Sequence, residues 1–411
     1  MNILFVVPYV PDRIRTRSYH LVRQLGAHGH RVTVATVWTS PRERRIVEDL
    51  RRQGFDVRGT QLPVLRSAWN CIRALPGRLP LQAVFSWSPE AARAMATLLA
   101  SSDGRRPFDL VHVEHVRGAL YGLWLKRQGQ AEAERPPIVW DSVDCVSLLF
   151  QQAAQRSRSA FSRWLTRFET ERTARLEGRL LAEFDQVLAT SEFDAQALRS
   201  LGNGRRPSRP VSVLSNGVDA GYFTPGDPAG RVANRVVMTG KMSYHANVTM
   251  AAEFVTNILP RVAERHPDVE LWIVGKDPAR EVCRLARPGR VHVTGTVPDV
   301  RPYLRTAAVA VAPLSYGAGV QNKVLEAMSC GTATVISDVA ARGLTLKADQ
   351  HALVRTGSTA FAQGVSDLLS SPETRARLGE AGRRYVQQHH DWGQITLRLE
   401  EIYHGLIRPR A

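Results

Sequence analysis

The chain alternates short apolar runs with longer amphipathic stretches, and this alternation repeats in both halves of its 411 residues. Short apolar runs separated by helical stretches are typical of parallel strands that are buried on both faces and joined by crossover helices. A chain of this length suits two domains of roughly 200 residues each. The pattern therefore predicts an α/β protein with two doubly wound parallel-sheet domains.

The apolar periodicity also predicts where the elements lie. In the first half we expect helices at 19–27 and 90–100, and strands at 3–7, 32–37, 110–113, 138–140, 186–189 and 211–214. In the second half we expect helices at 249–263 and 322–329, and strands at 236–239, 271–274, 291–293, 309–312 and 334–336. An Asn-Gly turn at 216–217 follows the last strand of the first half and marks the expected joint between the domains. The predicted domains are therefore 1–215 and 216–390, followed by a terminal helix within 391–411 that packs back on the first domain.

Two further helical stretches invite different interpretations. Residues 151–181 form one expected helix with seven arginines, three glutamates and bulky apolar side chains. It either packs a face on the core or lies against a membrane surface or an acceptor. The tail at 394–407 has an apolar face made of Ile395, Leu397, Leu399, Ile402 and Leu406, so it must dock on another part of the chain.

The start of the chain and the spacing of its cysteines bear on the expected cellular location and on metal binding. The first apolar run covers only residues 3–7 and meets Pro8, unlike a secretory signal peptide, and no stretch reaches the ~20 apolar residues of a membrane helix. The four cysteines form no close pair, which predicts neither a zinc site nor a disulfide framework. We therefore expect a cytoplasmic protein with no metal site.

The net charge suggests an anionic partner. It is +17 for the whole chain, and residues 1–210 carry +12 of it. This excess fits attraction to membrane lipid, acidic glycan or nucleic acid, and it equally fits the arginine-rich composition of a GC-rich genome. Nucleic acid is not an expected partner, because the chain lacks basic motifs rich in aromatic residues. Peripheral contact with an anionic membrane, at its inner face, remains among the expected interactions.

The segment 313–336, PLSYGAGVQNKVLEAMSCGTATVI, carries the clearest chemistry. A strand ends at Pro313, a glycine-rich turn follows, and a helix begins near 320–322. Glycines let the backbone approach an anion, and the amides and dipole of a helix N-terminus attract it. Lys323 lies unfavourably in the first turn of this helix unless an anion such as a diphosphate binds there. Glu326 lies on the same helical face and can accept hydrogen bonds from ribose hydroxyls.

The run 319–331, GVQNKVLEAMSCG, resembles the donor-site signature of family 4 glycosyltransferases of the GT-B fold, in particular a bacterial exopolysaccharide-associated subgroup. The resemblance extends over nearly the whole chain. It includes VMTGKMSYHAN at 237–247, GTVPDV at 295–300, LSNGVD at 214–219 and IRTRSYH at 14–20. It implies two facing Rossmann-like domains, an N-terminal one for the acceptor and a C-terminal one for a nucleotide sugar.

The resemblance also implies roles for individual residues. Lys241 and Lys323 would hold the donor diphosphate and stabilise the leaving group, and Glu326 would bind the ribose. The loop at 317–320 would face the phosphates and the sugar with backbone amides, and Thr296 and Val297 would hold the base. The implied donor-site residues are Gly240, Lys241, Thr296, Val297, Gly317, Ala318, Gly319, Val320, Asn322, Lys323 and Glu326.

Two positions depart from the family pattern. Many relatives have a glutamate eight residues before Glu326, where this chain has Ala318. The donor sugar would then be gripped by backbone or by Asn322. Relatives often have a second basic residue where this chain has Asn247, and Lys323 would supply the missing charge.

Polar residues of the first half mark the expected acceptor or sugar side. The loop at 11–17 carries Arg13, Arg15 and Arg17, which either grip a phosphate or form an exposed basic loop. His112, Glu114 and His115 lie at the end of the strand 110–113, where such folds bind ligands, and either Glu114 or His115 would contact the sugar. Asp141 and Asp144 follow the next strand and either line the acceptor cleft or cap a helix.

The implied reaction is hexosyl transfer from a nucleotide-diphosphate donor, with UDP sugars favoured over GDP sugars, and with retention of anomeric configuration. The acceptor would be a glycan, a lipid-linked molecule or a small molecule. No cofactor is implied, and the absence of an Asp-x-Asp motif fits metal independence. Two alternatives remain open: a nucleotide-sugar 2-epimerase of the same fold, and an inactive scaffold of a polysaccharide assembly system.

Overall fold

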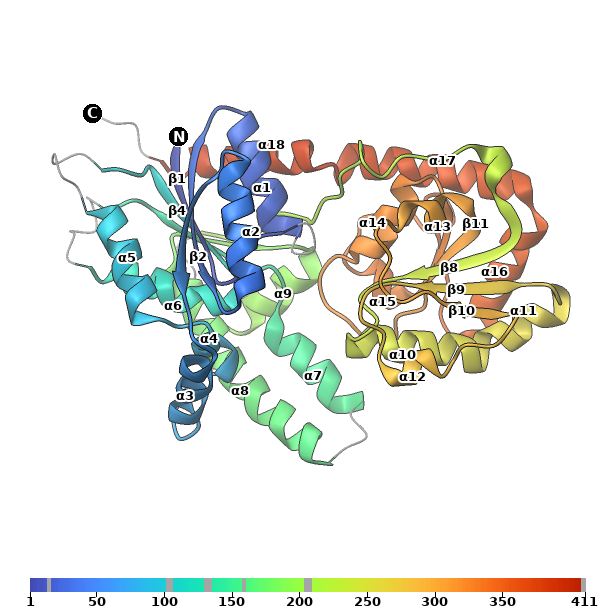
Figure 1. Ribbon diagram of the computed structural model, residues 1–411, viewed down its shortest axis with the longest axis horizontal. Helices are drawn as coiled ribbons and strands as arrows, with labels where there is room; N and C mark the ends of the chain where they lie inside the picture. Colours follow the sequence, from blue (N-terminus) through green and yellow to red (C-terminus); the bar gives the residue numbers. More distant parts are fainter. Residues whose placement is uncertain (13–15, 101–105, 129–134, 157–159, 203–208, 408–411) are drawn as a thin grey trace. The chain divides into compact units, whose positions relative to one another are not determined.

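The computed structural model describes residues 1–12, 16–100, 106–128, 135–156, 160–202 and 209–407. The chain divides into two compact units, each built on one parallel sheet (Figure 1). Unit 1 holds Met1–Ser215 together with Thr396–Ala411, and unit 2 holds Asn216–Ile395. The prediction of an α/β protein with two doubly wound parallel sheets is confirmed.

Unit 1 has a seven-stranded sheet in the order β3-β2-β1-β4-β5-β6-β7, with every neighbouring pair parallel. The central strands are buried and mostly apolar, because helices cover both faces of the sheet. Its strands are β1 (Asn2–Val7), β2 (Arg31–Trp38), β3 (Asp56–Gln61), β4 (Leu110–Glu114), β5 (Ile138–Asp141), β6 (Gln186–Ala189) and β7 (Ser212–Val213).

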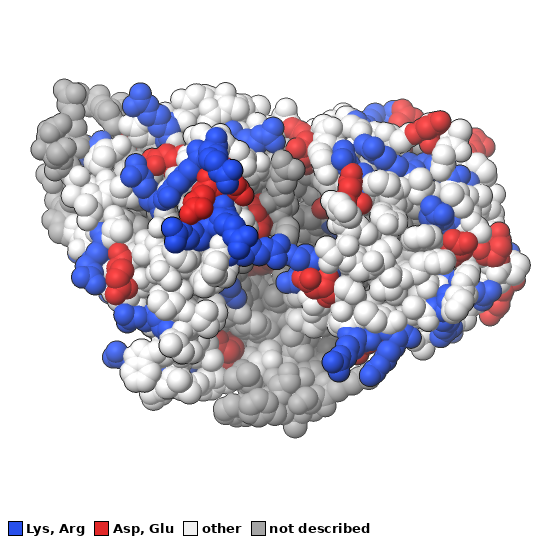
Figure 2. Space-filling model, in the orientation of Figure 1, with Lys and Arg blue, Asp and Glu red and all other residues white. Residues whose placement is uncertain are grey.

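Helices connect these strands. They are α1 (Thr16–Ala27), α2 (Pro41–Arg52), α3 (Val64–Ala74), α4 (Leu81–Phe85), α5 (Pro89–Leu99), α6 (His115–Lys126), α7 (Val146–Arg156), α8 (Ala160–Glu183) and α9 (Glu192–Ser200). The single helix predicted at 151–181 is wrong, because α7 and α8 are separate helices that pack against each other (Figure 1). Figure 2 shows many basic side chains on the face that carries α2, interspersed with acidic ones.

Unit 2 repeats the topology of unit 1. Its six-stranded parallel sheet has the order β10-β9-β8-β11-β12-β13. Numbered within each unit, both sheets begin 3-2-1-4-5-6, so the strand order reverses between β1 and β4 in unit 1 and between β8 and β11 in unit 2. The strands are β8 (Val232–Thr239), β9 (Glu270–Val274), β10 (Val291–Val293), β11 (Ala307–Ala312), β12 (Ala333–Ile336) and β13 (Leu353–Val354).

One of the helical stretches of unit 2 is interrupted by a π-helical turn. The stretch predicted as a single helix at 249–263 comprises α10 (His245–Glu253), a π-helical turn η2 (Phe254–Ile258) and α11 (Leu259–Arg265). The others are the 3₁₀ turn η1 (Pro228–Gly230), α12 (Arg280–Cys283), α13 (Arg301–Thr306), α14 (Asn322–Ser329), α15 (Asp338–Ala341), α16 (Ser358–Ser370) and α17 (Pro372–His389). The last helix, α18 (Trp392–His404), begins in unit 2 and continues into unit 1. No helix within the described ranges is both long enough and apolar enough to cross a membrane.

The chain returns to unit 1 within α18. Glu400 accepts hydrogen bonds from His28 at 2.8 Å and from His30 at 2.9 Å, both of which follow α1. The buried side of the helix contains Leu399 and Tyr403, whereas Leu397 is 47% exposed. The predicted apolar face is therefore wrong at Leu397, because the helix turns that side chain to solvent.

Candidate functional site

The clearest candidate site of unit 1 lies where the strand order reverses, at the carboxyl ends of β1, β4 and β5. Two residues at this edge, His115 at φ 65° and Val143 at φ 66°, adopt the left-handed conformation that non-glycine residues avoid. Val143 is β-branched, so its conformation costs on the order of 1–3 kcal/mol. Such strain persists only where the surrounding structure enforces it, and it is concentrated here at the ends of two neighbouring strands.

A buried ion pair joins Arg17 to Asp141 at this edge. Nε of Arg17 donates to Oδ2 of Asp141 at 2.8 Å, and its other nitrogens donate to the carbonyls of Leu214 and Ser215 at 3.0 Å. Burial opposes ionisation of Asp141, but the charge of Arg17 together with the hydrogen bonds from His112 and Arg17 outweighs this effect and holds the pKa of Asp141 well below its usual range. Arg17 is 5% exposed and lies in α1, so the interpretation as an exposed basic loop is wrong for this residue. Arg13 and Arg15 lie outside the described residues.

His112 connects this ion pair to the last helix. Its Nδ1 lies 2.7 Å from the hydroxyl of Tyr403, and its Nε2 lies 3.5 Å from Oδ2 of Asp141. The ring also stacks on Phe5, with centroids 4.2 Å apart. Burial lowers the pKa of His112, so the ring is neutral at pH 7. Tyr403 could not be placed in this network from the sequence, because nothing in the tail indicates which strand it reaches.

Glu114 and His115, the two predicted sugar-side residues, differ in exposure. Glu114 is 1% exposed and accepts a short hydrogen bond from the hydroxyl of Tyr9. Burial and the charge of Asp141 raise the pKa of Glu114 to about 7. His115 is half-buried, and its Nδ1 accepts a hydrogen bond from the backbone N–H of Arg117 at 3.3 Å. Burial lowers the pKa of His115 to about 3, so its ring is neutral and keeps an Nε2–H to donate.

Asp144 is half-buried, at the entrance to α7. It accepts a hydrogen bond from Oγ1 of Thr190 at 3.2 Å, and burial next to Asp194 raises its pKa. The N-terminus of α7 itself is capped by Glu177, which accepts hydrogen bonds from the N–H groups of Val146 at 2.8 Å and Ser147 at 3.2 Å. Helix capping at this point therefore uses Glu177 rather than Asp141 or Asp144.

The candidate site of unit 2 also lies at a reversal of strand order, on the loops after β8 and β11. Two glycines allow these loops to pack closely. A Cβ on Gly275 would lie 1.7 Å from the carbonyl oxygen of Gly240, and a Cβ on Gly343 would lie 2.4 Å from that of Gly319. Any side chain at Gly275 or Gly343 would therefore displace the loop it supports. The predicted glycine loop at 317–320 precedes α14 as expected.

Lys323 links the two loops. Its Nζ donates to Oδ1 of Asn247 at 2.9 Å and to Oε1 of Gln321 at 3.2 Å. Asn247 in turn donates through Nδ2 to the carbonyl of Lys241 at 3.0 Å. Asn247 is 4% exposed, and it joins the Lys241 loop to α14. The structure thus brings together Gly240, Lys241 and Lys323, and it adds Asn247 and Gln321 as residues that orient the lysine.

The charges of Lys323 and Glu326 are poorly compensated within the protein. Burial lowers the pKa of Lys323 to about 8, against the opposing effect of the Glu326 charge. Burial raises the pKa of Glu326 to about 7, against the opposing effect of Lys323. Both side chains lie on α14 and are half-buried. A lysine in the first turn of a helix, with its pKa lowered in this way, is a site that an anion would stabilise.

Other predicted donor-site residues lie on neighbouring loops. The carbonyl of Ala318 accepts a hydrogen bond from Nε2 of Gln321 at 3.1 Å, which folds the glycine loop onto the start of α14. Asn322 is the first residue of α14. Thr296 is exposed on the loop after β10 and accepts a hydrogen bond from the N–H of Asp277 at 3.3 Å, while Val297 packs beside α13. Thr296 and Val297 lie at the same carboxyl edge of the sheet as Lys323, but they follow β10, which is an outermost strand of this sheet.

His245 and Tyr316 are neighbours of this site that the sequence did not indicate. Nδ1 of His245 lies 2.6 Å from the hydroxyl of Tyr316, and the rings stack with centroids 5.4 Å apart. Burial lowers the pKa of His245. The pair ties the start of α10 to the loop after β11, a contact between segments about 70 residues apart that no local pattern reveals.

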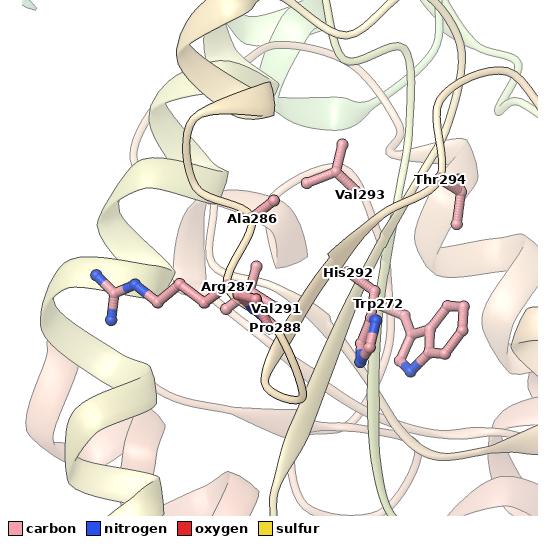
Figure 3. A pocket seen from close by; sticks show the side chains of 8 residues that line it. All are labelled: Trp272, Ala286, Arg287, Pro288, Val291, His292, Val293 and Thr294. Atoms are coloured by element: carbon pink, nitrogen blue, oxygen red, sulfur yellow. The ribbon is translucent and has the colours of Figure 1, made fainter.

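A separate cavity of about 450 Å³ opens at the outer edge of the same sheet (Figure 3). Trp272 and His292 stack beside it with centroids 4.4 Å apart, and the loop carrying Arg287 closes another side. None of the predicted donor-site residues lines this cavity. Within the described residues, no group of three or more His, Cys, Asp or Glu side chains is arranged to hold a metal ion.

Each of the two units matches the model of a known protein family. Residues 14–217 match the model of the glycosyl transferase 4-like domain, and residues 233–371 match that of the glycosyl transferases group 1. Together the two matches cover most of the chain and follow each other in the order of the two units.

Individual relatives are distant. A lipopolysaccharide core biosynthesis mannosyltransferase of Rhizobium leguminosarum bv. viciae is 23% identical over 278 residues, which are 64% of this chain and 72% of that enzyme. A phosphatidyl-myo-inositol mannosyltransferase of Mycobacterium tuberculosis is 28% identical over 203 residues, covering 46% of this chain and only 53% of the relative. The match to the second enzyme therefore spans about half of its length.

A solved structure shares the fold along the whole chain. Anabaena HepE, crystallised in complex with UDP and glucose, superposes with a TM-score of 0.66 at 14% identity, and the match covers 99% of this chain and 100% of that one. At this identity the likeness establishes the fold. With both family models matched in order on two such sheets, the chain belongs to the nucleotide-sugar-dependent glycosyltransferases of the GT-B fold, with a 4-like domain followed by a group 1 domain.

Proposed function

We propose that the chain transfers a hexosyl group from a UDP sugar, in preference to a GDP sugar, to a hydroxyl group of a lipid-linked glycan, with retention of anomeric configuration. The observation that carries this proposal is the arrangement around Lys323. Its ammonium group is oriented by Asn247 and Gln321, lies at the start of α14, and has a lowered pKa that a bound diphosphate would restore.

The donor would bind across the loops of unit 2. The diphosphate would contact Lys323, Lys241 and the amides of the loop at 317–320, and the ribose hydroxyls would donate to the Glu326 carboxylate. Thr296 and Val297 would contact the base. Because Ala318 offers no carboxylate to the sugar, its hydroxyls would be held by the backbone of this loop and by Asn322.

The chemical step needs positive charge on the leaving diphosphate. Lys241, Lys323 and the N-terminus of α14 supply it, and preorganised donors of this kind commonly contribute 10²–10³-fold to a rate. The acceptor hydroxyl would attack from the face that the diphosphate leaves, and a diphosphate oxygen would take its proton. No nucleophile from the protein is required.

In unit 1 we assign the sugar contact to His115. Its ring is half-buried, whereas Glu114 is buried against Tyr9. The backbone of His115 takes a strained left-handed conformation at the end of β4, as residues of functional sites often do. The buried ion pair of Arg17 and Asp141 would then act by positioning this edge, with Asp144 at the rim of the acceptor side.

The lipid-linked acceptor is supported by the names of two relatives. One is named for lipopolysaccharide core biosynthesis and the other for phosphatidyl-myo-inositol, and both of these molecules carry lipid. A lipid-linked acceptor would also suit the exopolysaccharide-associated subgroup that the sequence resembles. We therefore place the reaction in the building of a surface polysaccharide or glycolipid.

The test is a transfer assay with radiolabelled UDP and GDP sugars on a lipid extract that contains glycan acceptors. The proposal predicts transfer of label to the lipid phase from a UDP sugar, and a product whose anomeric configuration, read by NMR, equals that of the donor. An inverted product would contradict the retaining mechanism. Formation of an epimer from the donor alone would instead identify a nucleotide-sugar 2-epimerase.

A further inference from the structure

Helix α3 presents large apolar side chains to solvent. Within the described residues, seven of the eleven exposed large hydrophobic side chains lie between Val64 and Phe85. Leu65 is 84% exposed, Ile72 57% and Trp69 53%. These three residues are spaced by four and three positions, so they form one stripe along α3. Such a concentration is unlike the scattered single apolar residues of an ordinary protein surface.

The opposite face of α3 is the polar one, and it packs on the protein. Nδ2 of Asn70 donates to the carbonyls of Val84 at 3.0 Å and Trp87 at 2.8 Å, and Ser67 is 1% exposed. A helix on a water-facing surface normally buries its apolar side. The reversed orientation of α3 is therefore not explained by packing within unit 1.

The orientation of α3 is firmly held. Arg172 of α8 donates to the carbonyls of Ala74 at 2.9 Å, Leu75 at 2.6 Å and Leu79 at 3.3 Å, which fixes the end of the helix and the loop after it. Figure 1 shows α3 with α4 and α8 beyond the end of the unit 1 sheet. The apolar stripe is thus part of a supported platform rather than of a frayed end.

The charge on this platform has one sign. The segment 62–81 contains three arginines and no acidic residue. Arg66 is paired with Glu90, at 3.4 Å, while Arg73 and Arg78 are exposed. In Figure 2 the surface at the position of α3 is mostly uncharged. A rigid helix with Leu, Ile and Trp on one side and arginines beside them is the composition of elements that lie in the interface of an anionic bilayer.

We propose that α3 and the loop after it dock on an anionic membrane surface, with Leu65, Trp69 and Ile72 inserted at the headgroup level and Arg73 and Arg78 on lipid phosphates. The sequence left a membrane-facing role open for the stretch 151–181, whereas among the described residues the exposed apolar stripe lies on α3. Docking on the membrane requires neither donor nor acceptor, so this proposal can be tested independently of the proposed transfer reaction.

The experiment is cosedimentation of the full chain with vesicles of phosphatidylcholine containing phosphatidylglycerol, and with vesicles of phosphatidylcholine alone. We expect binding to the anionic vesicles that weakens in high salt. Leu65→Glu should lower the partition coefficient by about tenfold or more, since it removes a leucine that would insert into the bilayer and adds a charge that anionic lipid repels. Arg73→Gln and Arg78→Gln should each lower it by about fivefold.

The matched control is Leu397→Glu, which makes the same change at an exposed leucine of α18 in the same unit. It should bind vesicles as the wild type does. As a second readout, addition of anionic vesicles should shift the tryptophan emission of the wild type to shorter wavelength, and Trp69→Phe should remove that shift. Equal binding by Leu65→Glu and Leu397→Glu, or no binding to anionic vesicles, would overturn the proposal. So would a dimer in solution that Leu65→Glu converts to a monomer.

Discussion

Lys323 and Asn247 are 76 residues apart in the chain, yet Nζ of the lysine lies 2.9 Å from Oδ1 of the asparagine. Asn247 occupies a position where related enzymes often have a basic residue, and here its side chain instead holds the lysine of α14. The positive charge of the site is thus supplied by Lys323 and by Lys241, whose carbonyl is bonded to the same asparagine at 3.0 Å.

Removal of the Lys323 amine should impair the chemical step. Lys323→Ala leaves the departing diphosphate with one lysine fewer, so we expect kcat to fall by about 10²–10³-fold. Steady-state kinetics with a UDP sugar measures the effect. Lys347→Ala removes an exposed lysine of the same unit and should leave kcat unchanged. Equal rates for the wild type and Lys323→Ala would exclude this role.

Loss of the Asn247 amide should be milder. Asn247→Ala retains the ammonium group but removes a hydrogen bond that orients it, and it leaves the carbonyl of Lys241 without this donor. Removing a hydrogen bond to a charged group costs about 1.5–3 kcal/mol, so we expect kcat/KM to fall by roughly 10- to 100-fold. A variant as inactive as Lys323→Ala would indicate that Asn247 contacts the donor itself.

Donor binding should depend on pH in a bell-shaped manner. The diphosphate requires the charged form of Lys323, which is lost as the pH rises through about 8, and the ribose requires the carboxylate of Glu326, which is lost as the pH falls through about 7. UDP-glucose is a suitable probe, because its diphosphate is esterified at both ends and does not titrate in this range. Calorimetric titration between pH 6 and 9 should find the highest affinity between these two values.

Two variants separate the limbs of this profile. Glu326→Gln should flatten the acid limb and weaken binding at every pH, because an amide is a poorer acceptor for ribose hydroxyls. Lys323→Arg should flatten the alkaline limb, because a guanidinium group stays charged. Affinity that does not change with pH in the wild type would show that these two groups are not at the donor site.

Breaking the buried ion pair of unit 1 should destabilise the protein. Arg17→Met leaves the Asp141 carboxylate buried without its partner, at a cost of about 3–5 kcal/mol. Because the folded-state pKa of Asp141 is lowered, the stabilisation from the pair is present at neutral pH and is lost as the pH falls through that lowered value. Thermal unfolding of Arg17→Met, Asp141→Asn and the double variant should show strong coupling. Additive effects of the two substitutions would contradict the pair.

The hydroxyl of Tyr403 should anchor the last helix to unit 1. Tyr403→Phe removes the hydrogen bond to His112, and we expect a loss of about 1 kcal/mol in the free energy of unfolding. Tyr222→Phe, which removes the hydroxyl of an exposed tyrosine in unit 2, is the control and should change stability little. An unchanged melting temperature in Tyr403→Phe would mean that the bond contributes nothing.

The apolar periodicity was sufficient to predict the interior strands and their order of appearance. Strands such as β1 and β11 are buried on both faces, so after Asn2 every residue of these two strands is apolar and the run is easily recognised. Two strands, β3 (Asp56–Gln61) and β13 (Leu353–Val354), were not predicted from the sequence. β3 has a single buried residue and therefore no apolar run, and β13 is only two residues long. Both are edge strands, whose pairing comes from the neighbouring strand rather than from their own pattern.

The candidate site could be predicted only in part. The glycine turn and Lys323 lie on one continuous segment, so the sequence indicates their chemistry directly. The bonds of Lys323 to Asn247, of His245 to Tyr316 and of His112 to Tyr403 join distant segments, and no local pattern specifies them.

The central claim is that a nucleotide-diphosphate sugar binds on the loop at 317–320 and the start of α14. Calorimetric titration of the wild type, Lys323→Ala, Glu326→Ala and Lys347→Ala with UDP-glucose and GDP-mannose tests it most directly. The account predicts that the wild type and Lys347→Ala bind UDP-glucose alike, and that both other variants lose at least about tenfold in affinity. Wild-type affinity in Lys323→Ala and Glu326→Ala, or no binding of either nucleotide sugar to the wild type, would contradict it.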